Sequence, residues 1–443
     1  MNYNFNANKS HFLVYLVGIG GISMSALATY LKKTGFAVSG YDNKLSVITD
    51  QLEGLGISIN DTNDLINCDI AVVSSAINEN DPIIKKLKSL NKAIISRARL
   101  LSEIASTYPL TIGVAGTHGK TTTTAMIAHV LKQAKSRFCA HVGGFDKHFG
   151  NLAYFGDQIF LSEVCEYKRN VNLFSPTIGV LLNVSDDHLE SYGRFSVLEE
   201  TFSCYLQRSE RAVVLYEQRK YAQNAITFSL DNANANYYAS QIVLNKDSVE
   251  CLVNEHSEPL FHLKLNCLHL HDVQNAMACV AVCKALEIDN QSIKIGLENF
   301  EGVKRRNEIL KVVNNATIFA DYAHHPEQIE DTVNFLKRRY KKFAVLFQSH
   351  TYSRTANLFS KFINSLKEIE NLFIFDTYGA REKYEYKGSG KRLAESLGGC
   401  VYCGQVENVK NLLPAIVEKF ECVAVLGAGD LYDFVCESIF EKQ

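Results

Sequence analysis

The stretch TIGVAGTHGKTTTTAMI, at residues 111–127, constrains the fold of this 443-residue chain more than any other. The apolar run at 112–115 is typical of a buried parallel strand, and residues 122–133 have the mostly apolar face of a packed helix. The turn between them consists of Gly116, Thr117, His118, Gly119, Lys120, Thr121 and Thr122. Glycines let backbone N–H groups form a concave nest, and a helix N-terminus adds partial positive charge. The pattern therefore predicts a phosphate-binding loop.

Two kinds of side chain in this loop have the chemistry that ATP binding needs. Lys120 can reach the β and γ phosphates, and the hydroxyl of Thr121 or Thr122 can ligate Mg²⁺. The usual phosphate loop has four residues between its first glycine and the Gly-Lys pair, whereas only Thr117 and His118 lie between them here. We nevertheless expect a phosphate loop, because the expected strand precedes it and the expected helix follows it.

Composition limits the classes of partner and location. The formal net charge is −2 and 21% of residues are charged, so neither nucleic acid nor a membrane surface is expected as a principal partner. No apolar run is long enough to span a bilayer, and the polar N-terminus lacks the apolar core of a signal peptide. The 12 cysteines are then expected to be reduced thiols, and the chain to be cytoplasmic.

The N-terminal region has the pattern of a nucleotide-binding sheet. Residues 11–42 predict a strand, a turn at Gly18, Gly20 and Gly21, a helix and a second strand that ends at Asp42. An acidic residue about 20 positions past the glycines is typical of dinucleotide sites. Ser74 and Ser75 lie at the end of another predicted strand. Because Gly-x-Gly alone is a weak signal, binding of a nicotinamide nucleotide stays open at this point.

Polar residues follow the strands predicted after the phosphate loop. Glu163 lies in the strand predicted at 160–167, and Asn183 and His188 follow the strand predicted at 178–182. Parallel strands end at the same edge of a sheet, so these residues are expected near Lys120. Glu163 suits a phosphate-bound Mg²⁺ and His188 a second cation, although each can equally be a cap or turn residue. Asn275, on a predicted helix, can face an adenine edge or have no such role.

The last third of the chain repeats the pattern of strand followed by polar loop. Arg306 belongs to a cluster of basic residues that is either a solvated charge run or a phosphate clamp. Asp321 and His324 follow one strand, and further strand–loop units lie at 344–354, 372–383 and 422–434. We therefore predict an α/β chain of three domains: a Rossmann-like sheet at 1–106, a central P-loop ATPase-type domain at 107–300 and a second Rossmann-like sheet at 301–443.

Eight motifs, in this order, resemble the Mur ligases of peptidoglycan synthesis over nearly the whole chain. They are GTHGKTTT, LNVSDDHLESY, HDVQNAMA, GVKRRNE, DYAHHP, FQSHTYSRT, DTYGAREK and LGAGD. VGIGGISMSALA and SSAI most resemble the branch of the family that joins L-alanine to UDP-N-acetylmuramate. The family pattern usually has GGIGMS, HNVxNA and HRYTRT, so the chain departs from it at Ser23, Asp272 and Thr351.

The resemblance implies an ATP- and Mg²⁺-dependent ligase that works through an acyl phosphate, as a monomer or homodimer. The UDP-sugar would be bound by Gly18, Gly20, Gly21, Ser23, Asp42, Ser74 and Ser75. ATP would be bound by the phosphate loop at 116–122 with Asn275, Arg306 and Asp321. The metal would be held by Thr121, Glu163 and His188. The amino acid would meet Tyr322, His350, Arg354 and Arg381. The catalytic residues implied are Lys120, His188, Arg306, His324, His350 and Arg354.

Three other functions stay open on the sequence. The first is a murein peptide ligase, which adds a tripeptide to the same nucleotide sugar. The second is a nicotinamide oxidoreductase, which would leave the Lys120 loop and the third domain unexplained. The third is a switch or binding protein that uses ATP for motion, which would leave the N-terminal sheet unexplained.

Overall fold

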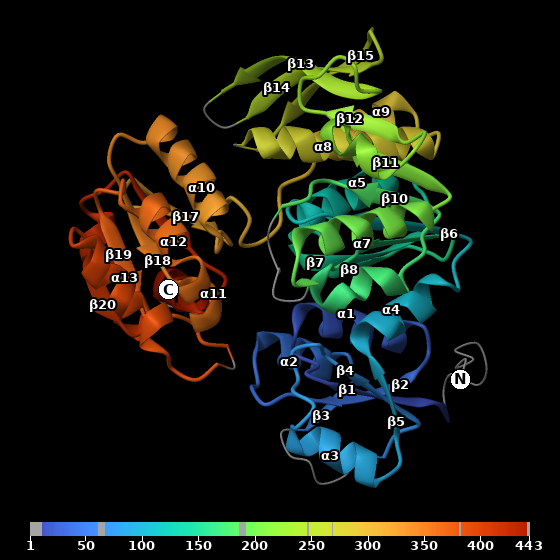
Figure 1. Cartoon of the computed structure of the whole chain (residues 1–443), viewed down its shortest axis with the longest axis horizontal. Coiled ribbons are helices and arrows are strands. Elements are labelled where there is room, and N and C mark those ends of the chain that lie inside the picture. Colours follow the sequence, from blue (N-terminus) through green and yellow to red (C-terminus); the bar gives the residue numbers. More distant parts are fainter. Residues whose placement is uncertain are drawn as a thin grey trace. The chain divides into compact units, whose positions relative to one another are not determined.

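The computed structural model describes residues 11–60, 67–185, 192–245, 248–267, 269–380 and 382–440. Contacts group the chain into two compact units, Met1–Glu301 and Gly302–Gln443. The described strands form three sheets, two in the first unit and one in the second (Figure 1). The predicted α/β fold with three sheets is therefore confirmed, while the boundary predicted between the first two domains stays a prediction.

The first sheet is parallel and has the strand order of a doubly wound fold. Its strands, in spatial order, are β3 (Ser58–Asn60), β2 (Ala37–Tyr41), β1 (Leu13–Val17), β4 (Ile70–Val73) and β5 (Ala93–Ser96). Successive side chains of β1 enter different cores, Val14 and Leu16 on one face and Tyr15 and Val17 on the other. A strand covered on both faces needs a continuous apolar run, which is what the sequence has there.

The central sheet places the phosphate loop at its middle. Its strands, in spatial order, are β15 (Glu258–Leu265), β14 (Val249–Glu255), β13 (Tyr237–Leu244), β12 (Ile226–Ser229), β11 (Arg211–Leu215), β10 (Ile178–Leu181), β6 (Leu110–Ala115), β9 (Ile159–Glu163), β7 (Phe138–Asp146) and β8 (Gly150–Tyr154). Strand β6 pairs in parallel with β9 and β10, so all three end at the same edge. Antiparallel pairs extend the sheet at both sides.

Helices cover both sheets of the first unit and join them. They are α1 (Ile22–Lys33), α2 (Val47–Gly54), α3 (Pro82–Ser89), α4 (Arg97–Ala105), α5 (Lys120–Gln133), η2 (Tyr167–Leu173), α7 (Phe195–Gln207), η3 (Tyr216–Tyr221), α8 (Leu270–Ala285) and α9 (Asn290–Glu298). Helix α1 of the first sheet packs on β7 and β8 of the central sheet (Figure 1). One apolar cluster contains residues of both sheets, for example Leu16 and Phe160, so the two sheets share a core.

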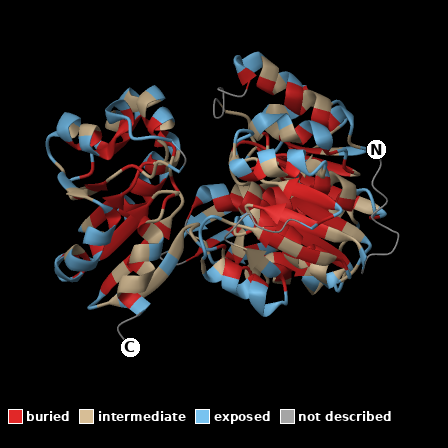
Figure 2. Cartoon of the chain, turned by 90° about the horizontal axis from the view of Figure 1, so that it is seen from below, coloured by how far each residue is buried: buried red, intermediate tan, exposed pale blue. Residues whose placement is uncertain are grey.

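The second unit is another doubly wound sheet with one antiparallel edge strand. Its strands, in spatial order, are β16 (Glu308–Val313), β17 (Ala316–Asp321), β21 (Cys422–Leu426), β18 (Phe343–Phe347), β19 (Leu372–Phe375) and β20 (Val401–Gly404). Its helices are α10 (Pro326–Arg339), α11 (Tyr352–Asn357), α12 (Phe359–Leu366), η4 (Tyr386–Gly388), α13 (Gly390–Leu397), η5 (Val406–Asn408), α14 (Val409–Val417) and α15 (Leu431–Phe440). Buried residues concentrate in the strands of each unit (Figure 2). Within the described ranges, none of the helices has the length and apolar character that a bilayer span requires.

Candidate active site

The strand, turn and helix predicted around the phosphate loop are confirmed. Strand β6 ends at Ala115 and helix α5 begins at Lys120, two positions earlier than expected. Gly116 and Gly119 have φ angles of 137° and 82°, in the region that favours glycine, and Gly119 is the residue that precedes the helix. The glycines are thus required by the turn that brings the backbone N–H groups to the start of α5.

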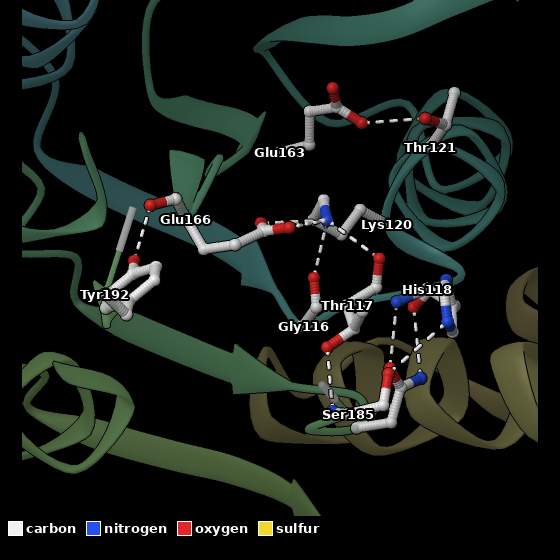
Figure 3. Close-up of polar contacts among 10 residues, drawn as sticks. Gly116, Thr117, His118, Lys120, Thr121, Glu163, Glu166, Ser185 and Tyr192 are labelled. Carbon is white, nitrogen blue, oxygen red and sulfur yellow. Dashed lines mark hydrogen bonds and ion pairs between the residues drawn. The ribbon is translucent and has the colours of Figure 1, made fainter. Parts of the chain in front are cut away.

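Asn183, at the end of the neighbouring strand β10, holds the loop in place. Its side-chain Oδ1 accepts from the backbone N–H of His118 at 2.8 Å, and its Nδ2 donates to the carbonyl of His118 at 3.1 Å. The Thr117 hydroxyl oxygen accepts from the backbone N–H of Ser185 at 3.0 Å (Figure 3). The expectation that residues after β10 lie at the edge of the phosphate loop is therefore correct for Asn183.

The ammonium of Lys120 is held by four oxygens. Its Nζ donates to the carbonyls of Gly116 at 2.5 Å and Thr117 at 3.0 Å, and to the Glu166 carboxylate at 2.9 and 3.1 Å (Figure 3). Burial alone would lower the pKa of Lys120, but the carboxylate of Glu166 and other nearby anionic groups raise it above its ordinary value. Lys120 is therefore a cation at neutral pH.

Glu166 is the site residue whose role the sequence did not indicate. The strand was expected to continue to residue 167, but β9 ends at Glu163 and the chain turns back toward the loop. The Glu166 side chain is only 3% exposed and pairs with Lys120, and its backbone carbonyl accepts from the Tyr192 hydroxyl at 2.5 Å. The available signal was a second acidic residue just beyond the end of a strand beside the phosphate loop.

Thr121 and Glu163 bring two oxygens together beside the loop. The Thr121 hydroxyl donates to Glu163 Oε2 at 2.7 Å (Figure 3). A Cβ placed on Gly143 would lie 1.7 Å from Glu163 Oε1, so the carboxylate occupies space that only a glycine leaves. A hydroxyl and a carboxylate are ligands of the kind that Mg²⁺ prefers, so these residues fit the expected metal. His188 lies outside the described residues, and its metal role stays a prediction.

Asn275 reaches the loop from helix α8. A Cβ placed on Gly119 would lie 2.4 Å from Asn275 Oδ1, so the amide lies directly against the loop's second glycine. Its position is compatible with a role at the nucleotide, and the contact with adenine stays a prediction.

The residues expected to bind the UDP-sugar converge at the carboxyl edge of the first sheet. The backbone N–H of Gly20 donates to Asp42 Oδ2 at 2.8 Å. Gly18 has a φ of 81°, and a Cβ placed there would lie 3.1 Å from Ser74 Cβ. Lys168 Nζ, from the central domain, donates to the carbonyl of Ser75 at 3.2 Å. The three loops therefore form one patch, whose ligand stays a prediction.

In the second unit, five of the predicted residues gather near the carboxyl ends of strands β17 and β18, namely Arg306, Tyr322, His324, His350 and Arg354. The His324 ring lies 5.1 Å from the Tyr322 ring and 6.0 Å from the His350 ring, measured between centroids. The Arg306 guanidinium carbon lies 4.6 Å from the Tyr322 ring centroid. Burial, assisted by the positive charge of Arg354, lowers the pKa of His350 to about 4. Both rings are thus neutral at neutral pH, because burial also lowers the pKa of His324 well below its ordinary value.

Of the two remaining predicted residues of this unit, Asp321 lies within the described structure and Arg381 does not. Asp321 ends β17, and its carboxylate accepts from the backbone N–H groups of Asn307 at 2.8 Å and Ala323 at 2.9 Å. Burial raises the pKa of Asp321 above its ordinary value, while Arg306 opposes this. Arg381 lies outside the described residues, so its contact with the amino acid stays a prediction.

Comparison with known families decides the class of the protein. Residues 13–109 match the model described as Mur ligase family, catalytic domain; residues 114–283 match the Mur ligase middle domain; and residues 305–429 match the Mur ligase, glutamate ligase domain. The chain belongs to the Mur ligase family. The resemblance found in the sequence motifs is thereby confirmed.

Individual Mur ligases match over nearly their whole length. The chain is 35% identical to the UDP-N-acetylmuramate–L-alanine ligase of Caldicellulosiruptor saccharolyticus, over 97% of this chain and 98% of that protein. It is 33% identical to the ligase of the same name from Acetivibrio thermocellus, over 95% and 94% of the two chains. The crystal structure of the UDP-N-acetylmuramate–alanine ligase of Thermotoga maritima has the same fold, with a TM-score of 0.83, 24% identity and coverage of 97% and 99%.

Proposed function

We propose that this Mur ligase joins L-alanine to the lactyl carboxylate of UDP-N-acetylmuramate and converts ATP to ADP and phosphate. The names of the two relatives with 33% and 35% identity support this choice of substrates. The observation that carries the proposal is the convergence of Lys120, Thr121 and Glu163 on one phosphate loop. That arrangement supplies a cation and hard oxygen ligands where a triphosphate would bind.

The first chemical step would be attack of the lactyl carboxylate on the γ-phosphorus, which expels ADP and leaves an acyl phosphate. A carboxylate is a weak nucleophile and is repelled by the triphosphate. Lys120, already cationic and fixed by its loop, would offset that repulsion and stabilise the charge on the transferred phosphoryl group. Because three ammonium protons already face four oxygens, phosphate binding at Lys120 requires rearrangement of at least one of these contacts.

Thr121 and Glu163 are proposed to hold Mg²⁺. When bound, the ion neutralises charge on the phosphates and orients them. The two groups lie in direct contact beside the loop, where the Thr121 hydroxyl donates to Glu163 Oε2 at 2.7 Å.

In the second step the amine of L-alanine would attack the acyl carbon and release phosphate, which forms the amide bond. Tyr322, His350 and Arg354 are proposed for the amino acid, with Arg381. Neutral His350 suits this role, because its Nδ1 is buried and has no hydrogen-bond partner among the described residues. A neutral imidazole nitrogen can accept a proton or hydrogen bond from an ammonium.

Phosphate release and product mass test the assignment together. The purified chain is incubated with ATP, Mg²⁺ and UDP-N-acetylmuramate, first alone, then with single amino acids, and then with the murein tripeptide. We expect phosphate only when sugar nucleotide and L-alanine are both present, with a product heavier by one alanyl residue. Release only with the tripeptide would instead assign the chain as a murein peptide ligase. Release that ignores the sugar nucleotide would reject both.

A further inference from the structure

A chain of hydrogen bonds crosses from the first sheet to the central sheet through His141. Ser23, at the start of α1, lies 2.8 Å from His141 Nε2, measured from its hydroxyl oxygen. On the other side of the ring, His141 Nδ1 lies 3.1 Å from Ser162 Oγ, and these two residues are register partners on β7 and β9. Ser162 Oγ then donates to the backbone carbonyl of Glu163 at 2.9 Å. His141 and Ser162 are buried.

The direction of every bond in this chain is fixed. The Ser162 hydroxyl gives its one proton to the Glu163 carbonyl, so its oxygen accepts from His141 Nδ1, which carries the ring hydrogen. In a neutral ring Nε2 is then the acceptor, so the Ser23 hydroxyl donates to it while the Ser23 oxygen accepts from Arg97 NH1 at 2.9 Å. Burial, together with the nearby charge of Arg97, lowers the pKa of His141 to about 4, which agrees with a neutral ring. One tautomer satisfies all the contacts.

The two ends of this chain lie at two different predicted substrate sites. Ser23 follows the Gly18–Gly21 turn, whose residues converge with Asp42 and Ser74. Glu163, at the other end, accepts from Thr121 of the ATP loop. Because Ser162 bonds the backbone of Glu163 itself, a shift of the His141 ring changes the position from which the Glu163 carboxylate projects.

We infer that His141 is a positioning residue that couples the sugar-nucleotide loop to the carboxylate beside the ATP loop. This inference rests on the proposed function, since it assigns the two loops to UDP-N-acetylmuramate and Mg²⁺-ATP. Its consequence is thermodynamic: each of these ligands raises the affinity for the other through the bridge from Ser23 to Glu163. By linkage the two effects are equal in size.

A second contact between α1 and the central sheet allows the effect of His141 to be separated from the effect of packing the two sheets together. Asn151 of β8 also reaches α1, where its Nδ2 donates to the carbonyl of Ile22 at 2.7 Å and to Ser25 Oγ at 2.8 Å. This second bridge joins the same helix to the same central sheet, but no hydrogen bond described for it leads to Glu163. Loss of docking alone would therefore affect variants of Asn151 and His141 alike, because both side chains bond α1.

Calorimetry of ligand binding tests the coupling without catalysis. The dissociation constant of a non-hydrolysable ATP analogue with Mg²⁺ is measured with and without saturating UDP-N-acetylmuramate. For the wild type we expect the sugar nucleotide to tighten analogue binding about fivefold or more, at the lower end of usual coupling. Ser162→Ala and His141→Phe should reduce this factor to within about twofold of one, and the double variant should behave like either single variant. Asn151→Ala should keep the wild-type factor.

The outcomes separate the inference from the proposed function. If the wild type binds both ligands without coupling, or if Ser162→Ala keeps the full factor, the inference is wrong and the ligase assignment stands. Equal loss of coupling in Asn151→Ala would mean that docking of the sheets, not His141, is responsible. Failure of the wild type to bind UDP-N-acetylmuramate would reject the proposed function, and the inference with it. If Ser162→Ala does not fold, Ser23→Ala breaks the same chain of hydrogen bonds at its other end. That variant should likewise reduce the coupling factor to within about twofold of one.

Discussion

Lys120 and Glu166 form a partly buried ion pair at the phosphate loop, with Lys120 Nζ 2.9 Å from Glu166 Oε2 and side-chain exposures of 15% and 3%. The Glu166 side chain is almost fully buried and that of Lys120 is largely covered, so water screens the attraction between the two charges only weakly. The pair holds in the loop the cation that we propose for phosphoryl transfer. It also makes the stability of this region depend on both residues.

Substitution of Lys120 should separate stability from activity. Lys120→Met removes the cation that lies against the buried Glu166 carboxylate, and we expect a loss of about 3 kcal/mol in the free energy of unfolding. The double variant Lys120→Met with Glu166→Gln removes both charges and should recover most of that loss. Urea unfolding followed by far-ultraviolet circular dichroism measures the cycle. A double variant no more stable than Lys120→Met would show that the pair is not the cause.

Both of these variants should lack ligation. Loss of a cation that stabilises a transferred phosphoryl group is expected to lower the rate by about a hundredfold or more. Binding of UDP-N-acetylmuramate should persist, because its proposed loops belong to the other sheet of the first unit. Ligation by Lys120→Met at more than about a hundredth of the wild-type rate would contradict the assignment of this loop.

The hydroxyl of Thr121 is expected to set the requirement for Mg²⁺. Thr121→Val keeps the shape of the side chain but removes the oxygen that bonds Glu163 at 2.7 Å. We expect the concentration of Mg²⁺ at half-maximal phosphate release to rise about tenfold, while Thr121→Ser, which keeps the hydroxyl, stays close to the wild type. Equal Mg²⁺ titrations for all three proteins would show that Thr121 does not contact the metal.

Gly119 should not tolerate a side chain. Its φ is 82°, and a Cβ there would lie 2.4 Å from Asn275 Oδ1. At this φ angle, a residue with a side chain is strained by about 1 to 2 kcal/mol. If the loop relaxes to avoid that strain, the affinity for ATP should fall roughly tenfold. Gly119→Ala is compared with Gly399→Ala, where the added Cβ meets no atom within 4 Å. The KM for ATP should rise only in Gly119→Ala, and an unchanged value there would reject a rigid loop.

His350 should make the protein less stable as the pH falls. Its pKa is about 4 in the folded chain against an ordinary value of 6.5, because the ring is buried beside Arg354, with Glu382 opposing the shift. Between these values the unfolded chain binds the proton more readily, so stability is complete above about pH 6.5 and declines toward pH 4. By pH 5 the loss is expected to be about 1 to 2 kcal/mol.

The variant His350→Gln isolates this contribution, because glutamine does not titrate. Urea unfolding of wild type and variant is compared at pH 7 and pH 5. The wild type should lose more stability than the variant between the two pH values. Parallel losses would mean that other groups, such as His141, account for the whole effect.

The sequence was sufficient to predict the elements but not the contacts between distant side chains. The phosphate loop, and the position of Glu163 and Asn183 at its edge, follow from local patterns and from the rule that parallel strands end together. The hydrogen bond that Lys120 donates to Glu166 depends on where β9 ends, which apolar composition does not specify. The bond from Ser23 to His141 spans 118 positions and two sheets, so only the packing of α1 on β7 reveals it.

One measurement tests the central claim, that the lactyl carboxylate is phosphorylated by ATP before the amide forms. UDP-N-acetylmuramate labelled with ¹⁸O in that carboxylate is turned over with ATP, Mg²⁺ and L-alanine, and the released phosphate is analysed by mass spectrometry. We predict that each phosphate carries one ¹⁸O from the carboxylate and that the product carries the alanyl residue. Phosphate without the label, or label transfer with no alanylated product, would contradict the account.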